Sequence, residues 1–449
     1  MNCILRGVRV IDPATQRDTP GQDVWLSEGR LISIYPRIDE GTVPVIDLTP
    51  PPGRPSCILA PGFIDLHAHL RDPGDEAAET TGSGARAAAA GGFTDVVAMA
   101  NTQPPVDSPE RVRAAVGRAQ AAETRLHPVA SVSLGLAGET AVDVEGCAEA
   151  GAVAFSDDGR NAAGPGVLGD VLTRAGRVGR AVLVHPEDER LIAACNAPGV
   201  PVARAPHRPA ATEIGAVEAA LDALRGARGG RLHLQHLSTA ASVEAVRRAR
   251  ADGLSVTAEV TPHHLAMWLP ASRVPDPPAL LKVNPPLREA HDREALIQGL
   301  REGVIDAVAT DHAPHTADQK AGNFASAAPG MTGLETALAT CLTLGAMHGD
   351  WIPVLLERLT TGPYRVIGSA AGLRAPGLRI GEPATCVVFD PDGQWTVGTE
   401  PSASLSRNTP LTGTLMRGRV LLTICDGAIT HQDGARLPWP AAFAEAPHG

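Results

Sequence analysis

Two histidines separated by one residue, His67 and His69, are the strongest chemical signal in this sequence. They follow the apolar run 57–64, which is typical of a short buried strand. Side chains alternate along a strand, so both imidazoles point to the same side and can bind one metal ion. Arg71 continues the same row, and its planar guanidinium suits a carboxylate or phosphate held beside the metal. Alone, the pattern equally fits two surface histidines near a turn, so the rest of the chain has to supply partners.

Composition restricts the classes of protein that need to be considered. The chain has 449 residues, room for two or three average domains or for one large barrel with an accessory domain. Its formal charge of −11 argues against non-specific binding of nucleic acid or of an anionic membrane surface. Seven scattered cysteines without a C-x-x-C pair suggest reduced thiols. With no signal-peptide pattern and no apolar run near 18 residues, the sequence predicts a soluble cytoplasmic protein.

The two ends of the chain resemble each other. Segments 4–12 and 23–34 show partial alternation of apolar and polar residues, and segments 384–390 and 413–423 have a similar character. We therefore expect one small β-sandwich domain built from both termini, residues 1–57 and 372–435.

The middle of the chain, residues 58–371, alternates short apolar runs with alanine-rich helical stretches such as 108–122 and 240–251. Eight repeats of strand and helix favour a (β/α)₈ TIM-like barrel, with an open doubly wound sheet as the second interpretation. The eight runs are 57–65, 93–100, 128–132, 152–155, 181–184, 232–234, 255–260 and 305–309.

Hydrophilic residues follow these runs at the ends where parallel barrels place their chemistry. Four histidines and two carboxylates in such positions suit a pair of divalent ions such as Zn²⁺, with water or hydroxide completing the coordination. A carboxylate after the eighth run can bind one ion and also accept a proton. The residues are His67 and His69, Asn101, Asp157 and Asp158, His185, His236, and Asp311 with His312 and His315. A structural role is the main alternative for His312, His263 and His264, and Asp157 fits a turn or capping role equally well.

These segments resemble the dihydroorotases of the amidohydrolase superfamily, most closely the bacterial class I branch. The match runs from the first strand of the barrel to residue 336, and a flanking β-domain is part of the resemblance. Two segments resemble the family signatures, DLHAHLRDPG at 65–74 and DHAPH at 311–315. Three more resemble its other landmarks, MANTQP at 99–104, FSDDG at 155–159 and KVNPPLR at 282–288.

The resemblance implies reversible hydrolysis of (S)-dihydroorotate to N-carbamoyl-L-aspartate in de novo pyrimidine synthesis. Two zinc ions per chain are implied, with a metal-bound hydroxide as nucleophile and Asp311 as general base and acid. By motif, Asp158 rather than Asp157 would bridge the ions, because the second carboxylate of Asp-Asp-Gly matches the bridge. The implied metal ligands are His67, His69 and Asp311 for one ion and His185 and His236 for the other, with Asp158 shared.

Substrate contacts are implied for a further set of residues, and segment 316–328 has the composition of a mobile lid, although a passive loop fits it as well. The expected partners are a small-molecule substrate and further copies of the chain, and the sequence leaves open whether the enzyme also docks to aspartate carbamoyltransferase. The expected substrate-contacting residues are His69, Arg71, Asn101, Asn284, His315, Pro329 and Gly330.

Two competing interpretations come from different classes of protein. Hydantoinases, dihydropyrimidinases and allantoinases share the H-x-H pair and the final aspartate, but they use a carboxylated lysine as the metal bridge. Here the fourth run ends in two aspartates and no lysine, and Arg71 favours a substrate that bears a carboxylate. A non-catalytic scaffold for aspartate carbamoyltransferase would typically lack some metal ligands, and all six are present.

Overall fold

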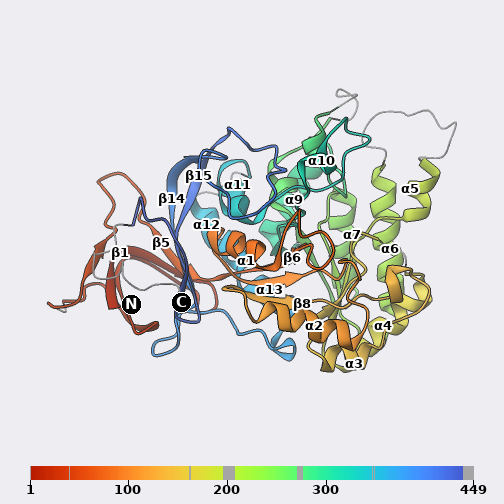
Figure 1. The fold of residues 1–449 in the computed structure, drawn as a ribbon, viewed down its shortest axis with the longest axis horizontal. Coiled ribbons are helices and arrows are strands. Elements are labelled where there is room, and N and C mark those ends of the chain that lie inside the picture. The colour runs from red at the N-terminus through yellow and green to blue at the C-terminus, as the bar shows by residue number, and fades with distance from the viewer. Residues whose placement is uncertain are drawn as a thin grey trace.

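The computed structural model describes residues 2–39, 41–160, 163–195, 208–270, 277–345, 347 and 349–437. Its centre is a barrel of eight parallel strands (Figure 1), which confirms the fold class expected from the alternating runs. Strand pairing forms two sheets, and the isolated bridges Ala130–Phe155 and Ala68–His312 join them at both seams. The strands are β6 (Phe63–Ala68), β7 (Phe93–Ala98), β8 (Arg125–Pro128), β9 (Ala154–Phe155), β10 (Ala181–Val184), β11 (Leu232–Leu234), β12 (Val256–Val260) and β13 (Ala307–Val308).

Helices follow every barrel strand and cover the outside of the barrel. Local sequence sets several of their starts: the Ser108 side chain caps α2 by accepting from Arg111 N, and proline occupies the first helical position. The helices are α1 (Thr81–Ala90), α2 (Pro109–Ala119), α3 (Val144–Glu149), α4 (Pro165–Arg177), α5 (Glu189–Cys195), α6 (Ala210–Gly226), α7 (Ala240–Ala251), α8 (Pro262–Ala266), α9 (Ala290–Glu302), α10 (Ala317–Lys320), α11 (Ala337–Thr343), α12 (Ile352–Leu359) and α13 (Thr361–Ile367).

Strands from both ends of the chain form a second, mixed sheet beside the barrel, on the left of Figure 1. The sheet encloses an apolar core of its own, as a β-sandwich does, so the expectation of one β-unit built from both termini is confirmed. Its order is β16-β15-β14-β5-β1-β2-β3, with β4 added on β1. The strands are β1 (Asn2–Asp12), β2 (Arg17–Ser27), β3 (Arg30–Tyr35), β4 (Val45–Asp47), β5 (Ile58–Pro61), β14 (Cys386–Thr396), β15 (Leu415–Cys425) and β16 (Ala428–Gln432).

Several expected strands differ in extent from those observed. The first run, 57–65, is divided at Gly62 between β5, which pairs with β1 and β14, and β6, which belongs to the barrel. The segment 23–34 is a hairpin, because Glu28 and Gly29 at its turn both have positive φ. The third run was expected at 128–132, whereas β8 ends at Pro128. The boundaries of the two units at residues 57 and 372 stay a prediction.

The barrel and the terminal sheet share a packed interface. Phe63 on β6 makes an edge-on contact with Phe93 on β7, with ring centroids 5.8 Å apart, and lies 6.4 Å from Phe389 on β14. All three rings are fully buried. In the part of the chain that the structure describes, no helix is both long and apolar enough to cross a membrane.

Two glycines at helix positions should respond oppositely to alanine. Gly117 lies on the exposed side of α2, and a Cβ there would meet nothing within 4 Å. We expect Gly117→Ala to stabilise the fold by about 0.5–1 kcal/mol, because alanine loses less backbone entropy on folding. Gly91 ends α1, where a Cβ would lie 2.1 Å from the Leu334 carbonyl oxygen. Gly91→Ala should destabilise by about 1–3 kcal/mol, and urea unfolding of both variants checks the two signs.

Candidate metal centre

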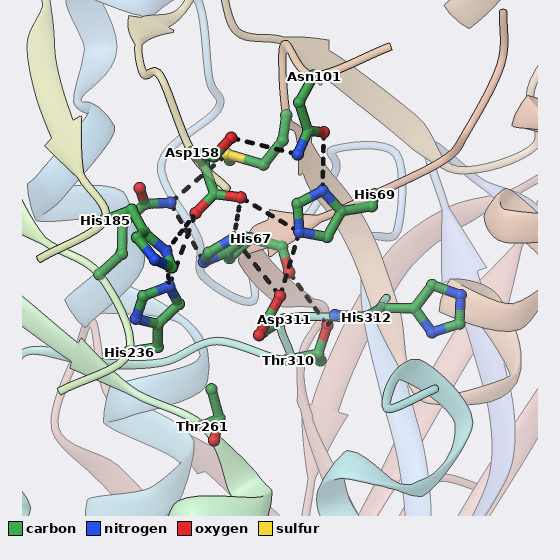
Figure 2. Close-up of polar contacts among 12 residues, drawn as sticks. His67, His69, Asn101, Asp158, His185, His236, Thr261, Thr310, Asp311 and His312 are labelled. Atoms are coloured by element: carbon green, nitrogen blue, oxygen red, sulfur yellow. Dashed lines mark hydrogen bonds and ion pairs between the residues drawn. The ribbon is translucent and has the colours of Figure 1, made fainter. Parts of the chain in front are cut away.

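Six side chains meet at the carboxyl ends of five barrel strands, where Figure 2 shows them pointing toward one another. All are buried, with exposures of 6% or less. Strand geometry explains the meeting, because the ends of parallel barrel strands surround one opening. The six are His67 and His69 from β6, Asp158 after β9, His185 after β10, His236 after β11 and Asp311 after β13.

Asp158 occupies the middle of this cluster. Its Oδ2 lies 3.2 Å from His67 Nε2 and 3.3 Å from His69 Nε2. Its Oδ1 lies 3.3 Å from His185 Nδ1 and 3.6 Å from His236 Nε2. Each carboxylate oxygen therefore faces a different pair of histidines, which is the arrangement that a ligand shared by two ions requires.

Asp311 follows β13, the strand next to β6 in the barrel, and contacts the first histidine pair from there. Its Oδ1 is 3.1 Å from His69 Nε2 and 3.7 Å from His67 Nε2. Two overlapping triads result, His67–Asp158–His236 and His67–His69–Asp311, and within each triad the possible ligand atoms lie within 4.8 Å of one another. Asp311 and His236 both have positive φ, 45° and 32°. Such backbone is uncommon outside glycine and persists only where the surroundings hold it.

The ring orientation of three histidines is set by a second set of polar groups. In each case one ring nitrogen faces an acceptor and donates to it, which leaves the other ring nitrogen turned toward the cluster. The pairs are His67 Nδ1 with Glu259 Oε1 at 2.9 Å, His69 Nδ1 with Asn101 Oδ1 at 2.9 Å, and His185 Nε2 with Glu187 Oε2 at 3.2 Å.

The two adjacent aspartates differ in orientation. The Asp158 N–H donates to Ser156 Oγ at 3.1 Å, and that hydroxyl donates to Gln235 Oε1, so the backbone at Asp158 is fixed from inside the barrel. Asp157 turns away from the histidines, and its Oδ1 accepts from the N–H groups of Val132 and Ser133 at 2.7 and 3.0 Å. Asp157 therefore holds the loop after β8.

Charge and hydrogen bonding make this cluster suited to divalent cations. Burial opposes ionisation of Asp158 and Asp311, but the neighbouring histidines outweigh it and hold the pKa of both carboxyls below the usual range. Within the described residues, His67 Nε2 and Asp158 Oδ1 are buried without a partner of hydrogen-bonding geometry. Imidazole and carboxylate donors that converge in this way are typical ligands of Zn²⁺ and related ions.

Arg71 and His315 lie together beside the cluster. Arg71 Nε donates to the Pro314 carbonyl at 3.1 Å, and no partner of its Nη groups is found in the described part of the chain. His315 Nε2 donates to the Pro329 carbonyl at 2.8 Å. Burial and the Arg71 charge lower the pKa of His315 to about 4, so its ring is neutral at pH 7.

The other residues expected to contact substrate differ in how far their polar groups are already hydrogen-bonded within the protein. Asn101 is occupied by His69 and by the Asp158 carbonyl, to which its Nδ2 donates at 3.2 Å. Asn284 follows a short 3₁₀ turn, 279–281, and its side chain has no hydrogen bond within the described residues. Gly330 N donates to the Lys282 carbonyl at 2.8 Å. Direct contact of Asn284, Pro329 and Gly330 with substrate stays a prediction.

Several residues that shape the site had no place in the sequence analysis. Glu259, fully buried on β12, accepts from both His67 and His233, and these bonds outweigh the cost of burial and lower its pKa to about 2. The sequence signal that could have identified Glu259 is a carboxylate inside the apolar run 255–260. No sequence signal points to Asn408. It lies on the loop between β14 and β15 and donates to the carbonyls of Ala313 and Gly330.

Two of the three histidines for which a structural role was the main alternative, His312 and His264, have structural partners. His312 Nδ1 accepts from Gly333 N at 3.1 Å, so its Nε2 donates to Glu79 at 3.2 Å, outside the cluster. His264 contacts the Thr261 hydroxyl and the Pro285 carbonyl. His263 is buried beside the cluster, and burial lowers its pKa to about 4.

Related structures share this fold at low sequence identity. The dihydropyrimidinase from Brevibacillus agri NCHU1002 and the L-hydantoinase from Arthrobacter aurescens both superpose with a TM-score of 0.82, at 23% and 24% identity. Each comparison covers 96% of this chain, and 95% and 96% of the respective structures. At this identity the likeness shows a common architecture.

Sequence relatives are much closer. Residues 56–203 match the family model described as Dihydro-orotase-like. Curated proteins named dihydroorotase from Thermus aquaticus, Anaeromyxobacter dehalogenans strain 2CP-C and Aquifex aeolicus strain VF5 are 41%, 39% and 36% identical. Each alignment covers 96% of this chain and 98–100% of the relative. The chain therefore belongs to the dihydroorotase family.

Proposed function

We propose that this chain catalyses the reversible hydrolysis of the ring amide of (S)-dihydroorotate, giving N-carbamoyl-L-aspartate, in pyrimidine synthesis. The observation that carries the proposal is the position of Asp158, with one oxygen toward each pair of histidines and no lysine in the cluster. Family membership over the full length supports the same reaction. A cytoplasmic location accords with seven cysteines that are all unpaired.

The geometry of the cluster supports the metal ligands that the family resemblance implies. His67, His69 and Asp311 would hold one divalent ion, His185 and His236 the other, and Asp158 would be shared. When bound, such a pair of ions, which we propose to be Zn²⁺, activates a water and polarises the carbonyl that it attacks. Glu259, Asn101 and Glu187 keep the imidazoles in the orientation that this requires.

Asp311 would move the proton. Its carboxylate is ionised at neutral pH and borders the first histidine pair, so it can accept a proton from the attacking water. As the water oxygen bonds to the ring carbonyl carbon, the carbon–nitrogen bond breaks and the proton passes from Asp311 to the departing nitrogen. In the reverse direction, ring closure, Asp311 accepts the proton from the attacking nitrogen and returns it to the departing water.

Arg71 would bind the substrate carboxylate. Its Nε is held by the Pro314 carbonyl, which leaves the two Nη groups for a bidentate contact. His315 beside it is neutral and adds no second charge to that contact. Fixing the carboxylate there decides which ring carbonyl faces the cluster, and orientation of this kind contributes strongly to rate.

The alternatives lack support. A carboxylated lysine would have to lie between the histidine pairs, but the chain has only Lys282 and Lys320, and both ammonium groups bind main-chain carbonyls. All six metal-competent residues are present and converge, which does not favour a purely structural scaffold. Association with aspartate carbamoyltransferase or with further copies of the chain stays a prediction.

Asp158→Ala should distinguish the roles of the two neighbouring aspartates. Without a shared carboxylate, two cations close together lose the negative charge between them, so we expect metal content to fall from about two ions per chain and most activity to disappear. Asp157→Ala is the matched control: it should keep the metal and cost about 1–3 kcal/mol of stability, because two buried N–H groups lose their acceptor. Elemental analysis beside urea unfolding distinguishes the two, and a reversed pattern would contradict the shared-ligand role.

Asp311→Asn tests proton transfer separately from metal binding. The amide keeps an oxygen for the metal but accepts no proton at neutral pH. We expect kcat to fall by about 10²–10⁴-fold while metal content is largely kept. Near-normal turnover by the metal-loaded variant would exclude Asp311 as the proton acceptor.

Arg71 tests the class of substrate. Loss of a charge-assisted bidentate contact should cost about 2–5 kcal/mol in kcat/KM for dihydroorotate, and Arg71→Lys should recover part of it. Dihydrouracil, which has no carboxylate, should be a poor substrate for the wild type and change little in Arg71→Ala. The ratio of kcat/KM for the two substrates is the measurement. A wild type that prefers dihydrouracil would favour a hydantoinase-like activity instead.

A further inference from the structure

The chain has only two lysines, and they lie close together in space although they are far apart in the sequence. Only two of the 39 lysine and arginine residues are lysines, Lys282 and Lys320. Lys282 precedes Asn284 on the loop after the 279–281 turn, and Lys320 ends α10 on the loop after β13. The two loops meet beside the metal centre, where Gly330 N donates to the Lys282 carbonyl at 2.8 Å.

The ammonium of Lys320 is the main polar group at this junction. It is 7% exposed, and its Nζ donates to the carbonyls of Ala328 and Gly330, both at 2.8 Å, and of Lys282 at 3.3 Å. Two of these carbonyls belong to its own loop and the third to the Lys282 loop. Lys282 differs: the one hydrogen bond of its Nζ within the described residues goes to the Ala325 carbonyl.

We propose that Lys320 is a positioning residue that joins the two substrate-facing loops. Its ammonium gathers three main-chain carbonyls, and this fixes Gly330 and the adjoining Pro329 against the loop that carries Asn284. The Pro329 carbonyl in turn orients His315, which lies beside Arg71. The inference rests on the proposed function, because its consequence is the geometry in which dihydroorotate is bound.

A lysine suits this position better than the arginine used elsewhere in the chain. Three donors on one tetrahedral nitrogen match three carbonyls that converge on a point, whereas a guanidinium spreads its donors over a plane. Asn408 adds a further bond to the Gly330 carbonyl, at 3.1 Å, but reaches neither Lys282 nor Ala328. Lys282 Nζ also joins the two loops, through its bond to Ala325, whereas Lys320 Nζ holds carbonyls of both loops at once.

The surroundings also make this ammonium sensitive to pH. Burial, followed by the charge of Lys282, lowers the pKa of Lys320 to about 8. Other ionisable groups on the elements around it include His315, which is neutral, Asp318 on α10 and Asp75, which accepts from Gln319. No carboxylate of the described residues forms an ion pair with Nζ. Above its pKa the amine keeps two N–H donors for three carbonyls, so the junction loosens as pH rises.

Three variants of the metal-loaded enzyme test the role. Lys320→Met should raise KM for dihydroorotate by about tenfold or more, with a much smaller change in kcat and unchanged metal content, because chemistry at the metals is left intact. Lys320→Arg should resemble Lys320→Met. Lys282→Met, the matched control, should show a clearly smaller rise. In the wild type KM should increase through pH 8, and in Lys320→Met it should not. Equal effects of the two methionine variants, or full function with arginine, would overturn the proposal.

Two measurements need no turnover and keep the test separate from the proposed function. Hydrogen–deuterium exchange of the peptide spanning 321–331 should be faster in Lys320→Met, because the Gly330 and Ala328 amides lose their fixed surroundings. Lysine labelled at Cε should give only two NMR signals, assigned by Lys282→Met, and the Lys320 signal should titrate near pH 8. Unchanged exchange, or titration at the pH of a free lysine, would refute the inference. A wild type inert toward dihydroorotate would refute the proposed function alone.

Discussion

Two carboxylates can be buried beside four imidazoles only if every charge faces an opposite one. Asp158 meets this condition by lying between the two histidine pairs, and Asp311 by contacting the first pair. The same condition explains Glu259: a fully buried carboxylate on β12 is stabilised by His67 and His233, and it fixes which nitrogen of His67 faces inward. The rest of the site depends on this balance of charge.

The backbone that positions these charged groups is strained, and contacts between loops hold it in place. Arg71, His236 and Asp311 have positive φ, and each lies at or just beyond the carboxyl end of a barrel strand. Such conformations cost free energy, which packing and hydrogen bonds around the barrel mouth must offset. The Asp65 carboxylate, which accepts from both Thr310 N and Thr310 Oγ1, ties the first strand of the barrel to the chain just before Asp311.

The terminal strands also contribute to the site. The loop between β14 and β15 reaches across the barrel mouth, where Asn408 accepts from His315 N and donates to Ala313 and Gly330. Ser404 and Leu405 of the same loop bind Glu79, the partner of His312. The terminal sheet is thereby coupled to the loop after β13, because removal of this segment would leave buried polar groups of the barrel without partners.

Local sequence patterns determined the barrel architecture and which residues meet at its mouth. Alternating apolar runs and alanine-rich stretches predict eight strand–helix repeats, and 240–251 is a helix with the predicted bounds, because these patterns reflect contacts close in the chain. Runs that end in histidine or aspartate predict that the six residues meet, since a barrel brings its strand ends together. Only the tertiary structure decided that 58–61 joins the terminal sheet, that Asp157 turns away from Asp158, and that Glu259, Asn408 and Lys320 hold the site. Those outcomes depend on contacts between residues tens to hundreds of positions apart, which spacing within one segment does not encode.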